Sequence, residues 1–136
     1  MVGNFIVADN RGIEFQCFCQ GYKKENLVLH PVFLEQGDLL TITNRKKYIV
    51  DVGWFILVKI NDSQEEFLPV DELEEAMTNE ALLDEIGCML KMLSISYYLD
   101  QALAIRNKKE FIKYSSIRNK FATLYERLCE KVYIET

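Results

Sequence analysis

The spacing of apolar residues changes once along this chain, near Pro69, and this change limits the folds available to it. Upstream, short stretches alternate apolar and polar residues, which is typical of strands with one buried face. Downstream, apolar residues recur every three or four positions, which is typical of helices. The sequence therefore predicts an α+β fold. We expect an N-terminal antiparallel β module over residues 1–70, as a curled sheet or a small open barrel, and a helical region over residues 71–136.

Turn residues divide the first region into short strands. We interpret the polar stretch at residues 44–47 as a turn, and Gly53 as a bulge or bend. Pro31 cannot donate a backbone hydrogen bond, so its strand should lie at an edge or end early. Residues 54–60 are nearly all apolar and predict a strand buried on both faces. The expected strands cover residues 13–19, 26–34, 39–43, 48–52, 54–60 and 66–70.

Three helices are expected in the second region, the middle one over about residues 79–105. Asp71 is the expected cap of a short helix over residues 72–77, and Thr78 is the expected cap of the next. The last helix carries an apolar stripe that could pack on the preceding helix, forming a hairpin at about residues 95–132, or could pair with another molecule. The stripe consists of Tyr114, Ile117, Phe121, Leu124 and Leu128.

The expected hairpin turns between residues 99 and 115. Asn107 is a good N-cap, and Glu110 stands three residues after it in a variant of the capping box. Leu103 and Phe111 flank this corner. From their spacing we expect both side chains to be buried on its inner side.

The same stretch resembles the signature of the IDEAL-domain family, a short helical module of Gram-positive bacterial proteins. The substituted positions are Leu99, Asn107 and Tyr114, where the family has Ile, Asp and Leu. The resemblance covers residues 99–115 only. It implies a helical module and brings no catalytic residues with it. The motif positions are Leu99, Asp100, Ala102, Leu103, Asn107, Phe111, Tyr114 and Ser115.

Charge is distributed unevenly along the chain, whose net charge is −5. Residues 62–85 contain ten acidic residues and no Lys or Arg, whereas residues 106–131 contain eight basic and three acidic residues. The two sets could attract each other within one fold, or the basic set could select a charged partner and speed its association. The candidate partner-binding residues are Lys108, Lys109, Lys113, Arg118 and Lys120.

From these patterns we expect a non-enzymatic regulatory or adaptor protein that contacts another protein through the hairpin. A second copy of the chain, paired through the last helix, is the alternative partner. The second hypothesis is a nucleic-acid-binding regulator that uses Arg45, Lys46 and Lys47 beside Tyr48. Nucleic-acid binding usually needs more cations than this acidic chain clusters there. No nucleophile elbow, P-loop, dinucleotide fingerprint or zinc-protease motif occurs, so we expect no enzyme.

The four cysteines are expected to be small buried thiols. Cys17 and Cys19 should share one face of a strand, which places them poorly for a disulfide. There is no C-x-x-C pair and His30 is the single histidine, so the spacing predicts no zinc site, and we expect no cofactor. No secretion signal and no apolar run of membrane-spanning length is present, so we expect a cytoplasmic protein without a membrane anchor.

Overall fold

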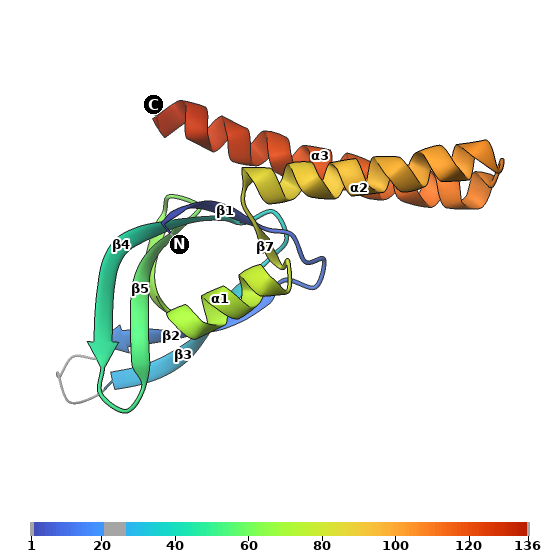
Figure 1. Ribbon diagram of the computed structural model, residues 1–136. Coiled ribbons are helices and arrows are strands. Elements are labelled where there is room, and N and C mark those ends of the chain that lie inside the picture. Colours follow the sequence, from blue (N-terminus) through green and yellow to red (C-terminus); the bar gives the residue numbers. More distant parts are fainter. Residues whose placement is uncertain (1, 21–26, 136) are drawn as a thin grey trace. The chain divides into compact units, whose positions relative to one another are not determined.

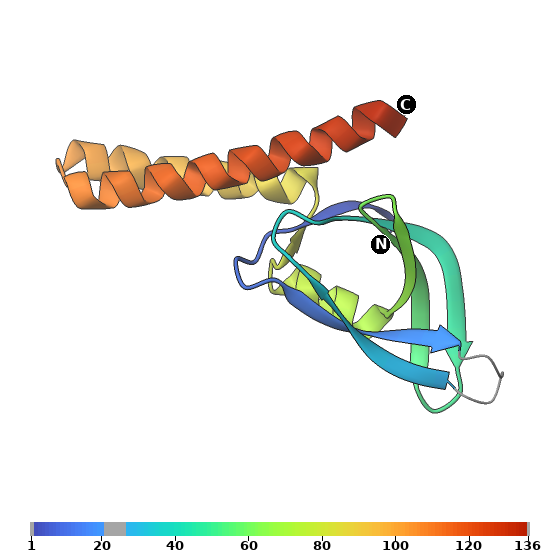
Figure 2. The same cartoon turned by 180° about the vertical axis from the view of Figure 1, so that it is seen from behind.

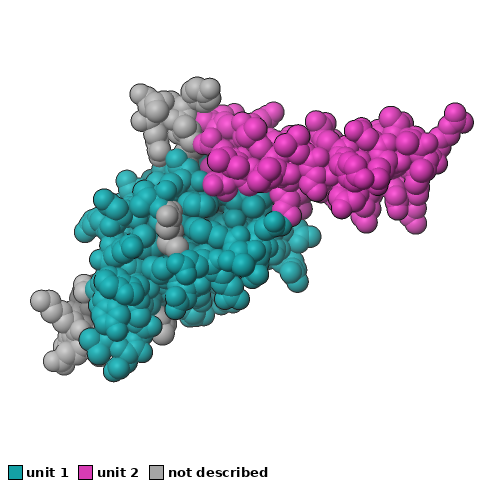
Figure 3. Space-filling model, viewed as in Figure 1, with its two compact units in different colours: residues 1–83 teal, residues 84–136 magenta. Residues whose placement is uncertain are grey.

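The computed structural model describes residues 2–20 and 27–135, with side chains described for residues 2–17 and 30–130. The side chain of Cys19 lies outside these ranges. Two compact units are present, Met1–Leu83 and Asp84–Thr136 (Figure 3). The first helix after Pro69 therefore belongs with the strands, whereas the spacing change suggested a division at residue 70. No helix in the described ranges is long and apolar enough to cross a membrane.

The first unit is built from two antiparallel sheets and one helix (Figure 1). The larger sheet has the strand order β6-β5-β4-β1-β7, and the smaller is the β2–β3 hairpin. Together with the helices of the second unit, this confirms the predicted α+β class with antiparallel pairing. The elements are β1 (Gly3–Val7), β2 (Ile13–Gln20), β3 (Leu27–Leu34), β4 (Leu39–Ile49), β5 (Gly53–Ile60), β6 (Gln64–Pro69), α1 (Val70–Thr78) and β7 (Leu82–Leu83).

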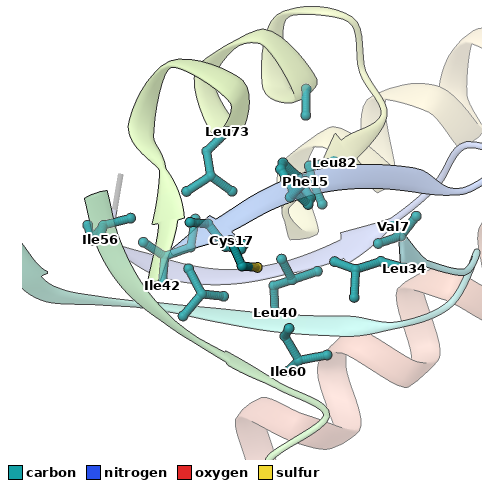
Figure 4. Packing of buried hydrophobic residues seen from close by; sticks show 13 residues of the cluster. Val7, Phe15, Cys17, Leu34, Leu40, Ile42, Ile56, Ile60, Leu73 and Leu82 are labelled. Atoms are coloured by element: carbon teal, nitrogen blue, oxygen red, sulfur yellow. The ribbon is translucent and has the colours of Figure 1, made fainter. Parts of the chain in front are cut away.

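The core of the first unit lies between the two sheets and α1. Phe15 and Cys17 of β2 point inward at alternate positions, and both are fully buried (Figure 4). Leu73 of α1 closes one side of the same cluster. On β5 the residues from Phe55 to Val58 are all buried, whereas Trp54 and Lys59 are exposed. The prediction of a strand buried on both faces is therefore confirmed for the middle of β5 only.

Three expectations about local structure are wrong. Residues 44–47 are not a turn but part of β4, whose pairing with β5 shifts register between Ile42 and Lys46, and the chain turns at residues 50–52 instead. A bulge leaves extra residues of one strand unpaired, so the strand can continue through polar residues whose side chains stay in solvent. Asp71 lies in the first turn of α1, whose N-cap is Pro69. Thr78 ends α1 rather than capping the next helix.

Pro31 is tolerated in β3 because, among the residues that the structure describes, the β2–β3 sheet has two strands, so β3 has a neighbouring strand in its sheet on one side. The expected edge position is confirmed. The strand nevertheless continues through Pro31 to Leu34, with Pro31 opposite Gln16 and His30 opposite Cys17.

The second unit is a helical hairpin of α2 (Glu85–Ala104) and α3 (Lys108–Glu135), which lie side by side in both views (Figures 1 and 2). Asp84 caps α2, because its Oδ1 accepts a hydrogen bond of 2.7 Å from the backbone N–H of Gly87. At the corner, the side chain of Asn107 accepts a hydrogen bond of 3.2 Å from the backbone N–H of Glu110. This confirms the predicted cap of the last helix.

The apolar stripe of α3 packs on α2, which confirms the hairpin interpretation of that stripe. Leu124 and Leu128 are buried, and Tyr114 stacks on Tyr98 of α2 with ring centroids 5.4 Å apart. Leu103 and Phe111 were expected to be buried at the corner, and this is wrong, since they are 64% and 38% exposed. Ala102 is the buried residue there. Leu103 lies about 100° further round the helix, away from α3.

Candidate protein-interaction surface on the helical hairpin

Helix α2 carries apolar side chains on two opposite faces. Cys88, Ile95 and Ala102 recur every seven residues and are buried against α3. At about 100° per residue, a second set lies on the opposite side of the helix. These residues are between 46% and 66% exposed, and we call them the α2 stripe: Ile86, Met89, Leu90, Leu93 and Tyr97.

The α2 stripe follows the spacing of a helix that binds a partner. Its members stand at i, i+3, i+4, i+7 and i+11, the pattern with which an amphipathic helix occupies an apolar groove. A helix that is apolar all round is normally buried on all sides. In the hairpin only one side of α2 is covered by α3. The uncovered side therefore has the composition of an interaction surface.

A shallow apolar hollow lies at the corner of the hairpin. Its volume is about 240 Å³, and it is lined by Leu103 and Phe111 with Ala102, Asn107 and the basic residues Arg106 and Lys108. Arg106 adopts a left-handed backbone conformation, with φ of 58°, which turns the chain between the two helices. Ala102, Leu103, Asn107 and Phe111 thus line an open hollow rather than a closed corner. Because the floor of the hollow is apolar and its rim is basic, it suits a partner segment that carries an apolar side chain next to an acidic one.

The five basic candidates on α3 do not form one face. Lys109, Lys113 and Lys120 share one flank of the helix within about 40°, and Arg127 continues the same flank. Lys108 lies at the corner hollow, and Arg118 is on another side. The ammonium of Lys113 is 5.5 Å from the ring centroid of Tyr114. Of the five predicted residues, three therefore share one flank of α3 and Lys108 lies at the corner hollow, whereas Arg118 belongs to neither place.

The basic residues proposed for nucleic-acid binding lie in β4 beside an exposed aromatic pair. Arg45 and Lys46 are exposed, whereas the Lys47 ammonium lies over the ring of Phe67, 5.7 Å from its centroid. Tyr48 and Trp54 face each other across β4 and β5 with ring centroids 5.2 Å apart, and both are more than half exposed. The two rings are tilted by 59° to each other, so they form no single flat surface, but exposed aromatic rings are the groups on which unpaired bases stack.

Cys88 of the hairpin is buried and does not suggest a reactive site, whereas Cys129 is only partly buried, so the expectation of a buried thiol is wrong for Cys129. Burial, followed by the nearby Asp84 carboxylate, raises the pKa of the Cys88 thiol to about 11. This thiol is therefore neutral and a poor nucleophile at neutral pH. Cys88 contributes to packing, as its sequence context predicted.

Sequence reasoning missed the α2 stripe as a site. The signal was present, because residues 85–104 contain two apolar stripes where one would suffice for a hairpin. No protein-family model, curated protein or solved structure matches this chain. Function is therefore inferred from the surfaces of the chain itself.

Proposed function

We propose that this chain is a non-enzymatic regulatory or adaptor protein that binds another protein through its C-terminal helical hairpin. The observation that carries the proposal is the α2 stripe, five apolar side chains exposed on one side of a helix whose other side is packed. Contiguous apolar surface of this kind is characteristic of interaction sites. In this proposal residues 99–115 form an IDEAL-like module that supplies the corner of the binding surface.

The chemistry of the partner follows from the hairpin. The partner presents an apolar groove that accepts the α2 stripe, with acidic residues at its rim. Arg106 and Lys108 at the corner, and Lys109, Lys113 and Lys120 along α3, supply the complementary charge. Charges at a rim mainly raise the rate of association, whereas buried apolar anchors supply most of the affinity.

A matched pair of substitutions on α2 tests the stripe. We expect Leu93→Arg to weaken partner binding by at least about tenfold, because it places a charge in the centre of the apolar surface. Ser94→Arg adds the same charge at the next exposed position, outside the stripe, and should leave binding nearly unchanged. The full chain and both variants are immobilised and exposed to lysate of the producing organism. Proteins retained by the parent and by Ser94→Arg, but lost by Leu93→Arg, are then purified and titrated.

Equal retention by the two variants would contradict the proposal. Circular dichroism of each variant shows that the hairpin is intact. Light scattering of the purified chain tests the alternative in which the surface is occupied by a second copy. If the parent chain and Ser94→Arg are dimers and Leu93→Arg is a monomer, the partner of the α2 stripe is a second copy of this chain and not another protein.

Charge reversal on α3 separates a protein partner from nucleic acid. For a protein partner, Lys109→Glu with Lys113→Glu should slow association, most strongly at low salt, while the dissociation rate changes little. The free energy of unfolding should change by about 1 kcal/mol or less, because exposed charge pairs contribute little. Stopped-flow or surface-based kinetics at two salt concentrations measure the effect. An association rate that is insensitive to both charge and salt would exclude the basic flank from the binding surface.

The second candidate function is binding of single-stranded nucleic acid by β4 and β5. The exposed pair of Tyr48 and Trp54 next to Arg45 and Lys46 favours it. In that case gel-shift titrations would show binding that weakens steeply with salt and is lost in Lys46→Glu with Lys47→Glu. We expect no retardation of DNA or RNA, because the chain carries a net charge of −5 and clusters few cations there.

A further inference from the structure

Three metal-binding side chains converge in the first unit. The Sγ of Cys17, a ring nitrogen of His30 and a carboxylate oxygen of Glu66 all lie within 4.8 Å of one another. The three residues come from β2, β3 and β6, and β2 lies against β6. From this geometry we propose that the β module binds one Zn²⁺ ion through Cys17, His30 and Glu66.

The strand register explains why the three side chains meet. Cys17 and His30 are directly opposite each other in the β2–β3 ladder, so their side chains leave the same face of that sheet. Phe15 and Cys17 are both fully buried, which identifies this face as the one directed at the core. On β6, Glu66 stands two residues before the fully buried Leu68 and therefore also points to the inner side.

Imidazole and carboxylate groups are unusual on inner faces. Alternation of the strands predicts apolar residues at positions 30 and 66, and a carboxylate brought out of water there carries a desolvation cost. The side chain of Glu66 is only 14% exposed, and its Oε2 lies 3.9 Å from Nε2 of His30. Its other oxygen, Oε1, accepts a hydrogen bond of 2.8 Å from Gln64 Nε2. That bond holds the carboxylate with Oε2 toward the histidine, as outer hydrogen bonds do for metal ligands.

The donor set selects the metal. Thiolate, imidazole and carboxylate together are a typical set for Zn²⁺, with bonds of about 2.0–2.3 Å. Tetrahedral coordination at that radius places donor atoms about 3.5 Å apart, so the three groups must close by about 1 Å on binding. We assign this movement to the side chains of His30 and Glu66, which are partly exposed, because Cys17 is fully buried in the core. The thiol proton of Cys17 is released to solvent when the metal binds.

Three protein ligands leave the fourth position of the metal open. Structural zinc sites are usually closed by four protein ligands, whereas three ligands and an open position characterise zinc that binds water or a small ligand. The His30 side chain is 36% exposed and lies on the solvent side of the cluster. Water or a small anion therefore reaches the fourth position past His30.

Calorimetric titration of the chelator-treated full chain with ZnCl₂ tests the proposal. We expect one Zn²⁺ per chain, with affinity that rises with pH because thiolate formation accompanies binding. Glu66→Gln should weaken binding by at least about tenfold. Glu65→Gln, on the opposite face of the same strand, should change it by less than about twofold. Both variants make the same chemical change at adjacent positions of one strand, and neither alters the core residue Cys17.

Two spectroscopic measurements complete the test, the first on the unaltered chain and the second also on two cysteine variants. His30 is the only histidine, so a shift of its imidazole resonances on addition of Zn²⁺ reports ligation directly. Co²⁺ in place of Zn²⁺ should give the thiolate-to-cobalt charge-transfer band, which Cys88→Ser retains and Cys17→Ser loses. Absence of binding, unchanged His30 resonances, or equal affinities of Glu66→Gln and Glu65→Gln would overturn the proposal.

Discussion

Truncation of Phe15 to alanine should lower the free energy of unfolding of the β module by about 3–5 kcal/mol. Phe15 is fully buried in the cluster between the two sheets and α1, so its removal leaves a cavity as well as losing transfer free energy (Figure 4). Urea unfolding followed by fluorescence of Trp54, the single tryptophan, reports on this unit. A loss of this size is a large fraction of the stability of a small domain.

Phe33→Ala is the matched control for this prediction. Phe33 pairs with Glu14, one residue from Phe15, but lies on the outer face of the β2–β3 hairpin and is 60% exposed. Its truncation should cost about 1 kcal/mol or less. If the two substitutions had similar effects, the inner and outer faces of this hairpin would be assigned incorrectly.

Much of the β module follows from the sequence because alternation with a period of two is a local property. Residues 13–17 show it clearly, and their pattern matches the observed burial of Phe15 and Cys17. The stretch at residues 44–47 could not be read in this way. Polarity alone does not distinguish a turn from an exposed strand segment next to a bulge, because both are solvated. Only the pairing with β5 decides between them.

The candidate sites depend on contacts that sequence spacing does not contain. Cys17, His30 and Glu66 are far apart in the chain, and cross-strand register and the approach of β6 to β2 bring them together. For Leu103 and Phe111, spacing correctly placed two apolar residues at the corner. Their burial was predicted wrongly because Ala102, one residue before Leu103, occupies the side that faces α3.

The turn between β1 and β2 should not tolerate a side chain at Gly12. Gly12 has φ of +77°, a conformation that costs residues with a Cβ atom about 1–2 kcal/mol. A Cβ at this position would also overlap the carbonyl oxygen of Leu34 and lie 2.6 Å from Cζ of Phe33. The backbone cannot withdraw easily, because the N–H of Gly12 donates a hydrogen bond of 3.1 Å to the carbonyl of Asp9. We therefore expect Gly12→Ala to cost about 2–5 kcal/mol in the urea measurement.

Gly53→Ala separates the two causes of the loss expected in Gly12→Ala, which are backbone strain and steric overlap of the added Cβ. Gly53 has φ of +121°, but no atom lies within 4 Å of a Cβ built there, so its substitution adds backbone strain without overlap. In the double variant Gly12→Ala with Phe33→Ala, the contact with the ring is removed while the overlap with the Leu34 carbonyl remains. The double variant should therefore recover only part of the stability lost in Gly12→Ala. The changes in unfolding free energy of the two substitutions should not add, because the side chains at positions 12 and 33 are in contact. Full additivity would show that the ring of Phe33 does not limit the space above Gly12, and that strain and the Leu34 carbonyl account for the loss.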